Sequence, residues 1–182
     1  MAGYSSVFID SGENYQKQSW RNRCRILTAD GPQDWMVPVV HSSGRAITQI
    51  EVEYTTPWVV KFERAVASAY DSSPFFEFYR DEFFAILDAH PATLWELNSR
   101  ITEWICRKIG VTPPEGTPEC PSGGDLRDAI HPKKPNTILA DMGLGHPYWQ
   151  VFRERFGFTP GLSVLDLLFN EGPDSIRWLK RL

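Results

Sequence analysis

The sequence has few cysteines, and none of the spacings that disulfide frameworks or zinc sites use. Its 182 residues include only Cys24, Cys106 and Cys120, which are far apart and form no C-x-x-C pair. An odd number of widely separated cysteines argues against a disulfide framework and against a zinc knuckle. We therefore expect reduced thiols, and we assign no metal ligands.

Long hydrophobic runs and an excess of positive charge are also missing. No apolar run reaches the roughly 18 residues that a transmembrane helix needs, and the first residues lack the basic and apolar regions of a signal peptide. The formal net charge is −4, whereas nucleic-acid-binding domains usually carry a basic stripe. These absences predict a cytoplasmic protein that neither inserts into a membrane nor binds nucleic acid.

Motifs that identify a reaction class are absent too. The sequence contains no GxxxxGK[ST] phosphate loop, no GxGxxG turn, no HExxH helix and no GxSxG elbow. Aromatic residues, in contrast, are abundant at 13%, with seven Trp and eleven Phe. Such residues build a large core, and they also line grooves that bind sugars or rings.

Two kinds of hydrophobic periodicity divide the chain. Alternating or short apolar runs predict four strands, at residues 6–10, 23–27, 35–40 and 47–54. Apolar residues every three or four positions predict helices, at residues 58–70, 74–90, 94–110, 149–155 and 163–169, and one more from Pro173. Thr93 and Ser163 stand where N-caps are expected. We predict an α+β fold, in which a mostly antiparallel or mixed N-terminal sheet packs against several C-terminal helices in a single domain, residues 1–182.

Residues 112–136 interrupt this pattern. The stretch "TPPEGTPECPSGGD" is rich in proline and glycine and poor in large apolar residues. Loops of this length inside a compact domain are often functional or disordered, so we predict a flexible loop. Lys133 and Lys134 within it are a candidate phosphate contact, and a solvated loop is the alternative.

Polar side chains are concentrated just after the first predicted strand. Asp10 ends that strand, Glu13 follows, and the chain continues "NYQKQSWRNR". A carboxylate near a reacting proton can serve as a base, and an arginine fork matches phosphate or carboxylate. Asp10 and Glu13 are therefore candidate catalytic residues. The candidate substrate-binding residues here are Tyr15, Lys17, Arg21, Asn22 and Arg23. The alternative is a surface hairpin with ordinary ion pairs.

A second group of candidates lies near the C-terminus. Tyr148 and Gln150, in "HPYWQVF", carry groups that can hydrogen-bond a hydroxylated substrate. Asp166 and Asn170, in "LSVLDLLFN", share one polar stripe of a predicted helix with Ser163. The substrate-binding candidates in this group are Tyr148, Gln150, Asp166 and Asn170; Ser163 is not one of them. The structural alternative is that Ser163 caps the helix and Asp166 supports that cap.

These motifs together resemble a known family. The stretches "ENYQKQSWRNRCRIL", "VPVV", "AYDSSPFFEFYRDE", "LWELN", "LRDAIHPKKP" and "YWQVFRERFGFTPGLSVLDLLFNEGP" are similar, in this order, to the WbqC-like protein family. The recurring positions of that family match Glu13, Tyr15, Lys17, Arg21, Asn22, Arg23, Tyr148, Gln150, Ser163, Asp166 and Asn170. Members usually carry an additional N-terminal segment, which this sequence lacks.

The resemblance also implies a function. The family is bacterial, and its members are known mainly from gene clusters for O-antigen and other surface polysaccharides. It implies a transferase that moves an amino acid or acyl group onto a small-molecule substrate, a nucleotide-activated amino sugar. In that expectation Arg21, Arg23 and Lys17 hold phosphate, and Asp10 or Glu13 frees the amine. A non-catalytic binding protein of the same pathway and a hydrolase using both acids are the alternatives. Cofactor and oligomeric state are left open.

Overall fold

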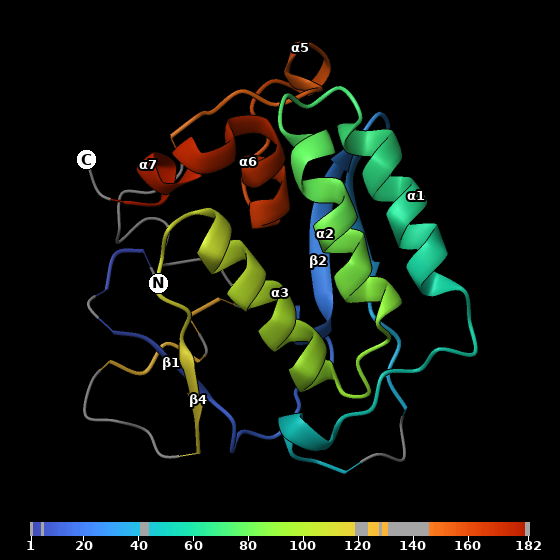
Figure 1. Cartoon of the computed structure of the whole chain (residues 1–182), viewed down its shortest axis with the longest axis vertical. Helices are drawn as coiled ribbons and strands as arrows, with labels where there is room; N and C mark the ends of the chain where they lie inside the picture. The colour runs from blue at the N-terminus through green and yellow to red at the C-terminus, as the bar shows by residue number, and fades with distance from the viewer. Residues whose placement is uncertain are drawn as a thin grey trace.

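The protein has the α+β architecture that its sequence predicts (Figure 1). The computed structural model describes residues 2–4, 6–40, 44–118, 124–127, 129–130 and 146–180. Within these residues there are two separate two-stranded sheets. One of them, formed by β2 (Arg23–Thr28) and β3 (Gly31–Met36), lies against the helices.

The β2–β3 hairpin is antiparallel and in register from Arg23 opposite Met36 to Thr28 opposite Gly31. The strand predicted at residues 35–40 is wrong in its bounds, because β3 begins four residues earlier and ends at Met36. Beyond Met36 the ladder ends. Pro38 has no N–H to donate to a ladder, and a hydrogen bond from Val37 N to the carbonyl of Asn22 (2.8 Å) closes this end of the hairpin.

The strand predicted at residues 47–54 is also wrong. This segment contains the 3₁₀ helix η2 (Ile47–Gln49) and only isolated bridges to other segments. Its alternating pattern reflects burial, since Ile50 and Val52 are both in the core. Its backbone pairs instead with the start of a helix, through Leu94 N and the carbonyl of Ile50 (2.8 Å).

The second sheet joins two distant parts of the chain. Strand β1 (Phe8–Asp10) pairs in parallel with β4 (Glu115–Thr117), so that Asp10 lies opposite Thr117. Strand β4 lies inside the 112–136 segment, where we predicted a flexible loop. The candidate phosphate contacts Lys133 and Lys134 lie outside the described residues.

The helices follow the predicted order. They are α1 (Trp58–Tyr70), α2 (Phe76–Asp88), α3 (Leu94–Lys108), α5 (Arg153–Phe156), α6 (Val164–Glu171), η3 (Gly172–Asp174) and α7 (Ser175–Leu179). Both predicted N-caps are confirmed. The Thr93 hydroxyl accepts from Glu96 N (3.2 Å), and the Ser163 hydroxyl accepts from Leu165 N (3.3 Å).

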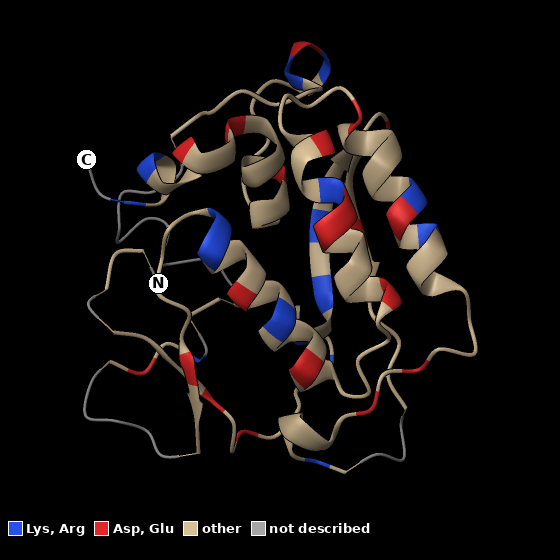
Figure 2. Cartoon of the chain, viewed as in Figure 1, with Lys and Arg blue, Asp and Glu red and all other residues tan. Residues whose placement is uncertain are grey.

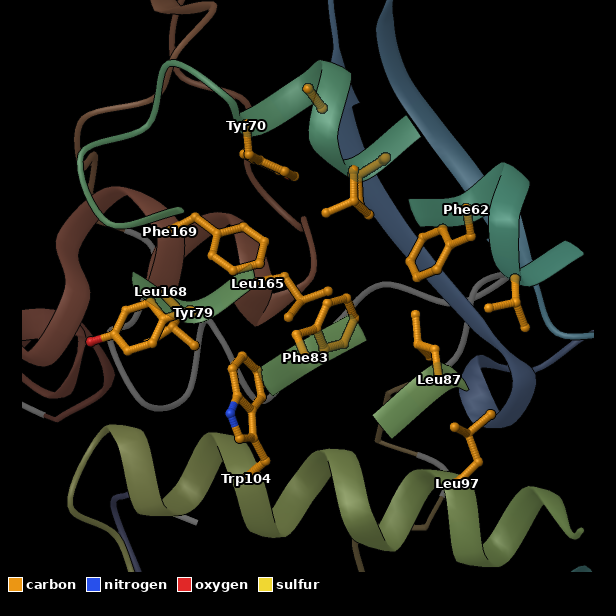
Figure 3. Close-up of a cluster of buried hydrophobic side chains, with 14 of the residues drawn as sticks. Phe62, Tyr70, Tyr79, Phe83, Leu87, Leu97, Trp104, Leu165, Leu168 and Phe169 are labelled. Carbon is orange, nitrogen blue, oxygen red and sulfur yellow. The ribbon is translucent and has the colours of Figure 1, made fainter. Parts of the chain in front are cut away.

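Charged residues of both signs are spread over the visible faces of α1, α2 and α3 (Figure 2). Apolar residues cover the opposite faces, where Phe83, Trp104, Leu165 and Phe169 converge in one cluster (Figure 3). Phe83 stacks on Trp104 with ring centroids 5.4 Å apart. This aromatic core fixes α2, α3 and α6 relative to one another. None of the described helices is long and apolar enough to cross a membrane.

A glycine at the end of α6 tests this packing. Gly172 has a φ of +56°, and a Cβ added there would lie 2.6 Å from the ring of Phe75. Gly157 is a matched control, because its φ of +69° and ψ of −160° are close to the +56° and −132° of Gly172 and the space around its added Cβ is open. Gly157→Ala should cost about 1–3 kcal/mol of unfolding free energy for this backbone conformation. Gly172→Ala should cost about 1–3 kcal/mol more for the overlap.

Urea denaturation of the two variants measures this difference. Equal losses of stability would contradict the close approach of α6 to the residues that precede α2.

Candidate functional site

A cavity of about 180 Å³ lies between the β2–β3 hairpin and helices α1, α2, α3 and α6. Most of its wall is apolar, and Trp35, Phe62, Phe83, Leu97 and Ile101 all contribute. The cavity is partly open to the surface, as a binding site for a small molecule must be.

Two neighbouring residues give the cavity polar character. Asn22 and Arg23 both line it. Asn22 Oδ1 and Arg23 Nε are buried and make no hydrogen bond, a condition that only Glu63 Oε1 shares among the described residues. A buried polar atom without a partner costs about 1–3 kcal/mol. Both atoms have almost no accessible surface, so protein atoms cover them, and a ligand in the cavity reaches them only if neighbouring side chains move.

Side-chain amides fix the backbone around these two residues. Asn22 Nδ2 donates to the carbonyl of Val37 (2.9 Å), and Asn98 Nδ2 donates to the carbonyl of Arg21 (2.7 Å). The Ser19 hydroxyl caps η1 (Trp20–Asn22) by accepting from Arg21 N. The segment that carries Asn22 and Arg23 is therefore held from the hairpin and from α3 at the same time.

Sequence reasoning missed the contribution of α3. Asn98 lies beside a stripe formed by Leu97, Ile101 and Ile105, which recur every four residues and all line the cavity. An amide next to an apolar helix face was a usable signal, since a polar group at such a position needs a partner.

The first predicted acid, Glu13, lies at the edge of this site. The Arg21 guanidinium binds it with two hydrogen bonds, from Nε to Oε1 (2.7 Å) and from Nη2 to Oε2. Both side chains are only 15–16% exposed, so this pair is better shielded than an ordinary surface ion pair. Arg21 itself lines the cavity, whereas Glu13 does not and reaches the site only through this ion pair.

The second predicted acid, Asp10, belongs to a different region. Its Oδ2 accepts from Arg127 Nη1 (2.8 Å), and its Oδ1 accepts from Gly12 N (2.8 Å). Asp10 lies on the β1–β4 sheet and does not line the cavity. The structure therefore does not bring Asp10 and Glu13 together as a pair of acids at this cavity.

The remaining residues of the polar stretch have different surroundings. Tyr15 is half-buried and packs against the core, and burial raises the pKa of its hydroxyl. Lys17 is exposed. Cys24 lines the cavity, but burial, with the nearby charge of Asp34, raises the pKa of its thiol to about 12. Because the thiolate is the reactive form, Cys24 is not a nucleophile at neutral pH.

The C-terminal candidates form a buried hydrogen-bond network around Asp166. Its Oδ2 accepts from the Tyr148 hydroxyl (2.6 Å) and from Gln150 Nε2 (3.0 Å). The side chains of Gln150 and Asp166 are almost completely buried. Asn170 joins through its Nδ2, which donates to the backbone carbonyl of Asp166 (2.7 Å).

This network also includes a residue that sequence reasoning missed. The Tyr70 hydroxyl, at the end of α1, accepts a hydrogen bond from Leu27 N of β2 (3.3 Å), and it lies close enough to Asp166 to lower the pKa of that carboxyl. No pattern around Tyr70 pointed to this role, because the contact joins residues 96 positions apart. The four predicted C-terminal candidates thus lie together, with their polar groups bound to one another.

The comparisons with known proteins agree with the resemblance in the motifs. The sequence profile of the WbqC-like protein family matches residues 5–117. The chain belongs to this family. It is also 25% identical over 198 residues to an uncharacterized protein of Mycobacterium tuberculosis strain H37Rv, covering 92% of this chain and 85% of that one. No solved structure matches significantly.

The matched region contains most of the cavity of this WbqC-like protein. Every element that lines it, except α6 and the residue that precedes it, falls within residues 5–117. The site combines an apolar cavity with two lining arginines, Arg21 and Arg23, and Arg21 holds the shielded carboxylate of Glu13. Such a site can bind a small organic group by its polar end, and Glu13 can accept a proton once Arg21 releases it.

The carboxylate of Asp166 gives this protein a testable pH dependence. Burial raises the pKa of Asp166 above its ordinary value of 3.8, although the hydrogen bonds from Tyr148, Gln150 and Tyr70 oppose the shift. The folded state therefore binds more protons than the unfolded state between the two pKa values. The free energy of unfolding attributable to Asp166 should fall as the pH rises through its folded-state pKa.

Urea denaturation of the wild type and of Asp166→Asn, from about pH 4 to pH 7, isolates this contribution as a difference. We expect that difference to decrease as the pH rises. Asp34→Asn is the matched control, since Arg25 lowers the pKa of Asp34, and its stabilising contribution is lost as the pH falls. A difference for Asp166 that increases with pH would contradict the burial argument.

Proposed function

We propose that this protein is a cytoplasmic transferase of bacterial surface-polysaccharide biosynthesis, acting in O-antigen assembly. It moves an amino acid or acyl group onto the amine of a nucleotide-activated amino sugar. Family membership supports the pathway. The observation that carries the reaction class is the apolar cavity that Arg21 and Arg23 line, together with the carboxylate of Glu13 that Arg21 holds.

The cavity volume decides which part of the substrates enters. At about 180 Å³ it is smaller than the roughly 300–1,000 Å³ of pockets that enclose drug-sized ligands. The acyl group therefore enters, and the nucleotide stays outside. Exposed Lys17 provides positive charge for its phosphates outside the cavity. Arg23, which lines the cavity, donates to the acyl oxygen, on which negative charge develops during transfer.

The proposed step joins the sugar amine to an activated acyl donor, such as a thioester. The amine nitrogen attacks the carbonyl carbon, a C–N bond forms, and the C–S bond breaks with its electron pair leaving on sulfur. Glu13 takes the proton that the nitrogen loses, and that proton then passes to the thiolate. In this assignment Tyr148, Gln150, Asp166 and Asn170 position α6 and do not contact the substrates.

A second candidate function is non-catalytic binding of a sugar intermediate of the same pathway. The observation in its favour is that both candidate acids are bound by arginines, Glu13 by Arg21 and Asp10 by Arg127. A carboxylate held in this way must lose its partner before it can act as a base.

Product analysis tests the proposed reaction. The protein is incubated with nucleotide-activated amino sugars and a panel of acyl and aminoacyl thioesters, and the amide product is measured by mass spectrometry. We expect an amide product from the wild type and a loss of about 100-fold in Arg23→Lys, because loss of one preorganised donor to a developing oxyanion has about this effect.

Arg25→Lys is the matched control. Arg25 is two residues further along β2, pairs with Asp34 (2.6 Å) and does not line the cavity, so this variant should keep full activity. Binding of a nucleotide sugar without any product, across the whole panel, would favour the second function. Sugar nucleotide cleavage without an acyl donor would instead indicate a hydrolase.

A further inference from the structure

The cavity has an exposed end and a closed end. Met36, the last residue of β3, is the only exposed residue among the described residues that line the cavity, with 54% of its surface accessible. Phe83 and Leu87 of α2 line the same cavity and are only 1% and 2% exposed. The cavity therefore opens beside Met36, and its closed end lies against Phe83 and Leu165 in the aromatic core (Figure 3).

Polar residues lie at the exposed end. Arg23 is the partner of Met36 in the β2–β3 ladder, and the carbonyl of Asn22 accepts from Val37 N, directly after Met36. The residues at the closed end, in contrast, are all apolar. A molecule that matches this arrangement has a polar end and an apolar tail.

The charged residues along the cavity have one sign. Arg21 and Arg23 are the only charged residues among the described residues that line it, and Glu13, which binds Arg21, is not part of the lining. An arginine matches a carboxylate or an acyl oxygen, whereas an ammonium group would meet like charge without a lining carboxylate. The polar end of the ligand is therefore a carboxylate or an acyl oxygen and not an amine.

The volume of the cavity limits the tail. An apolar cavity of about 150 Å³ holds one benzene molecule, so the space of about 180 Å³ here holds a chain of about six carbons. A longer chain would meet Phe83, whose ring packs against Trp104 and Phe169. In a close-packed core such a ring cannot move aside without disturbing its neighbours.

We propose that the cavity binds an unbranched apolar acyl chain of about six carbons, that this acyl group is the one which the enzyme transfers, and that Phe83 limits its length. The acyl oxygen lies at the exposed end beside Arg23, and the chain runs inward to Phe83 and Leu165. This inference rests on the proposed transferase function for its biological meaning. The binding itself can be measured without any reaction.

Isothermal titration calorimetry of the full chain tests the ligand class. The probes are acetate, butanoate, hexanoate, octanoate and decanoate, with hexylamine and L-2-aminohexanoate as amines of the same chain length. Affinity should rise about fourfold per methylene from acetate to hexanoate, as expected when each methylene is buried. Decanoate should bind at least about tenfold more weakly than hexanoate, because its additional methylenes do not fit. Both amines should also bind at least about tenfold more weakly, because they bring positive charge to the arginines.

Two pairs of variants separate the cavity from its surroundings. Phe83→Leu shortens the wall at the closed end and should move the tightest-binding chain from hexanoate to octanoate. Phe76→Leu is its control, because Phe76 is buried on the same helix without lining the cavity, and hexanoate should stay the tightest. Ile101→Phe fills the cavity from α3 and should weaken hexanoate binding by about tenfold while leaving acetate unchanged. Ile86→Phe should change neither, because Ile86 is half-buried against the same core without lining the cavity. Thermal melts establish which variants are folded.

Several results would overturn the inference. It is wrong if affinity does not rise with chain length, if decanoate or L-2-aminohexanoate binds as tightly as hexanoate, or if no probe gives heat or a thermal shift at millimolar concentration. It is also wrong if folded Phe83→Leu has the chain preference of Phe76→Leu. If Phe83→Leu does not fold, unchanged hexanoate binding in Ile101→Phe rejects the inference instead.

The proposed function can fail separately. Hexanoate binding without amide product from any donor would leave the binding site and reject the transferase. Amide formation from acetyl or aminoacyl donors, with no preference for a longer apolar chain, would do the reverse.

Discussion

The buried carboxylate of Asp166 connects parts of the chain that are far apart in sequence. Tyr148 and Gln150 reach it from the segment before α5, and Tyr70 reaches it from the end of α1. Tyr70 also accepts a hydrogen bond from Leu27 of β2. A charge placed so deep is tolerated only where several donors surround it, so the segments that supply those donors must arrive together. This requirement fixes the position of α6. Because Leu165 of α6 lines the cavity, it also fixes that side of the cavity wall.

The residues at the cavity, in contrast, leave part of their hydrogen-bonding capacity unused. Around the backbone of residues 21–23 the amides of Asn22 and Asn98 donate to carbonyl groups, yet two polar atoms of the same segment stay unpaired. The segment of residues 21–23 is therefore held at one side of the apolar cavity and carries an unmet hydrogen-bonding cost. A ligand that binds only the folded cavity would stabilise the fold.

Much of this arrangement could be predicted from the sequence, because helices are local. The helix at residues 58–70 and the caps at Thr93 and Ser163 depend on neighbours within a few positions, and the structure confirms them. The strands at 35–40 and 47–54 failed because alternation reports burial on one side and does not identify the hydrogen-bonding partner. Strand β4 carries no apolar pattern at all and forms only through pairing with β1. Contacts between segments that are distant in sequence also explain why the site was only partly predicted. Asn22 and Arg23 were identified as polar candidates, but the walls of the cavity come from helices far along the chain.

The most direct test of the central claim is the Nε–H signal of Arg23 in a proton–nitrogen NMR spectrum, assigned by its absence from Arg23→Lys. In the free protein this N–H is buried without a hydrogen-bond acceptor. The account predicts that an acyl or aminoacyl donor shifts this signal at saturation, because Arg23 lines the cavity, and that a nucleotide sugar without an acyl donor does not. An Arg23 signal that stays unchanged while the donor binds to the protein would contradict the account.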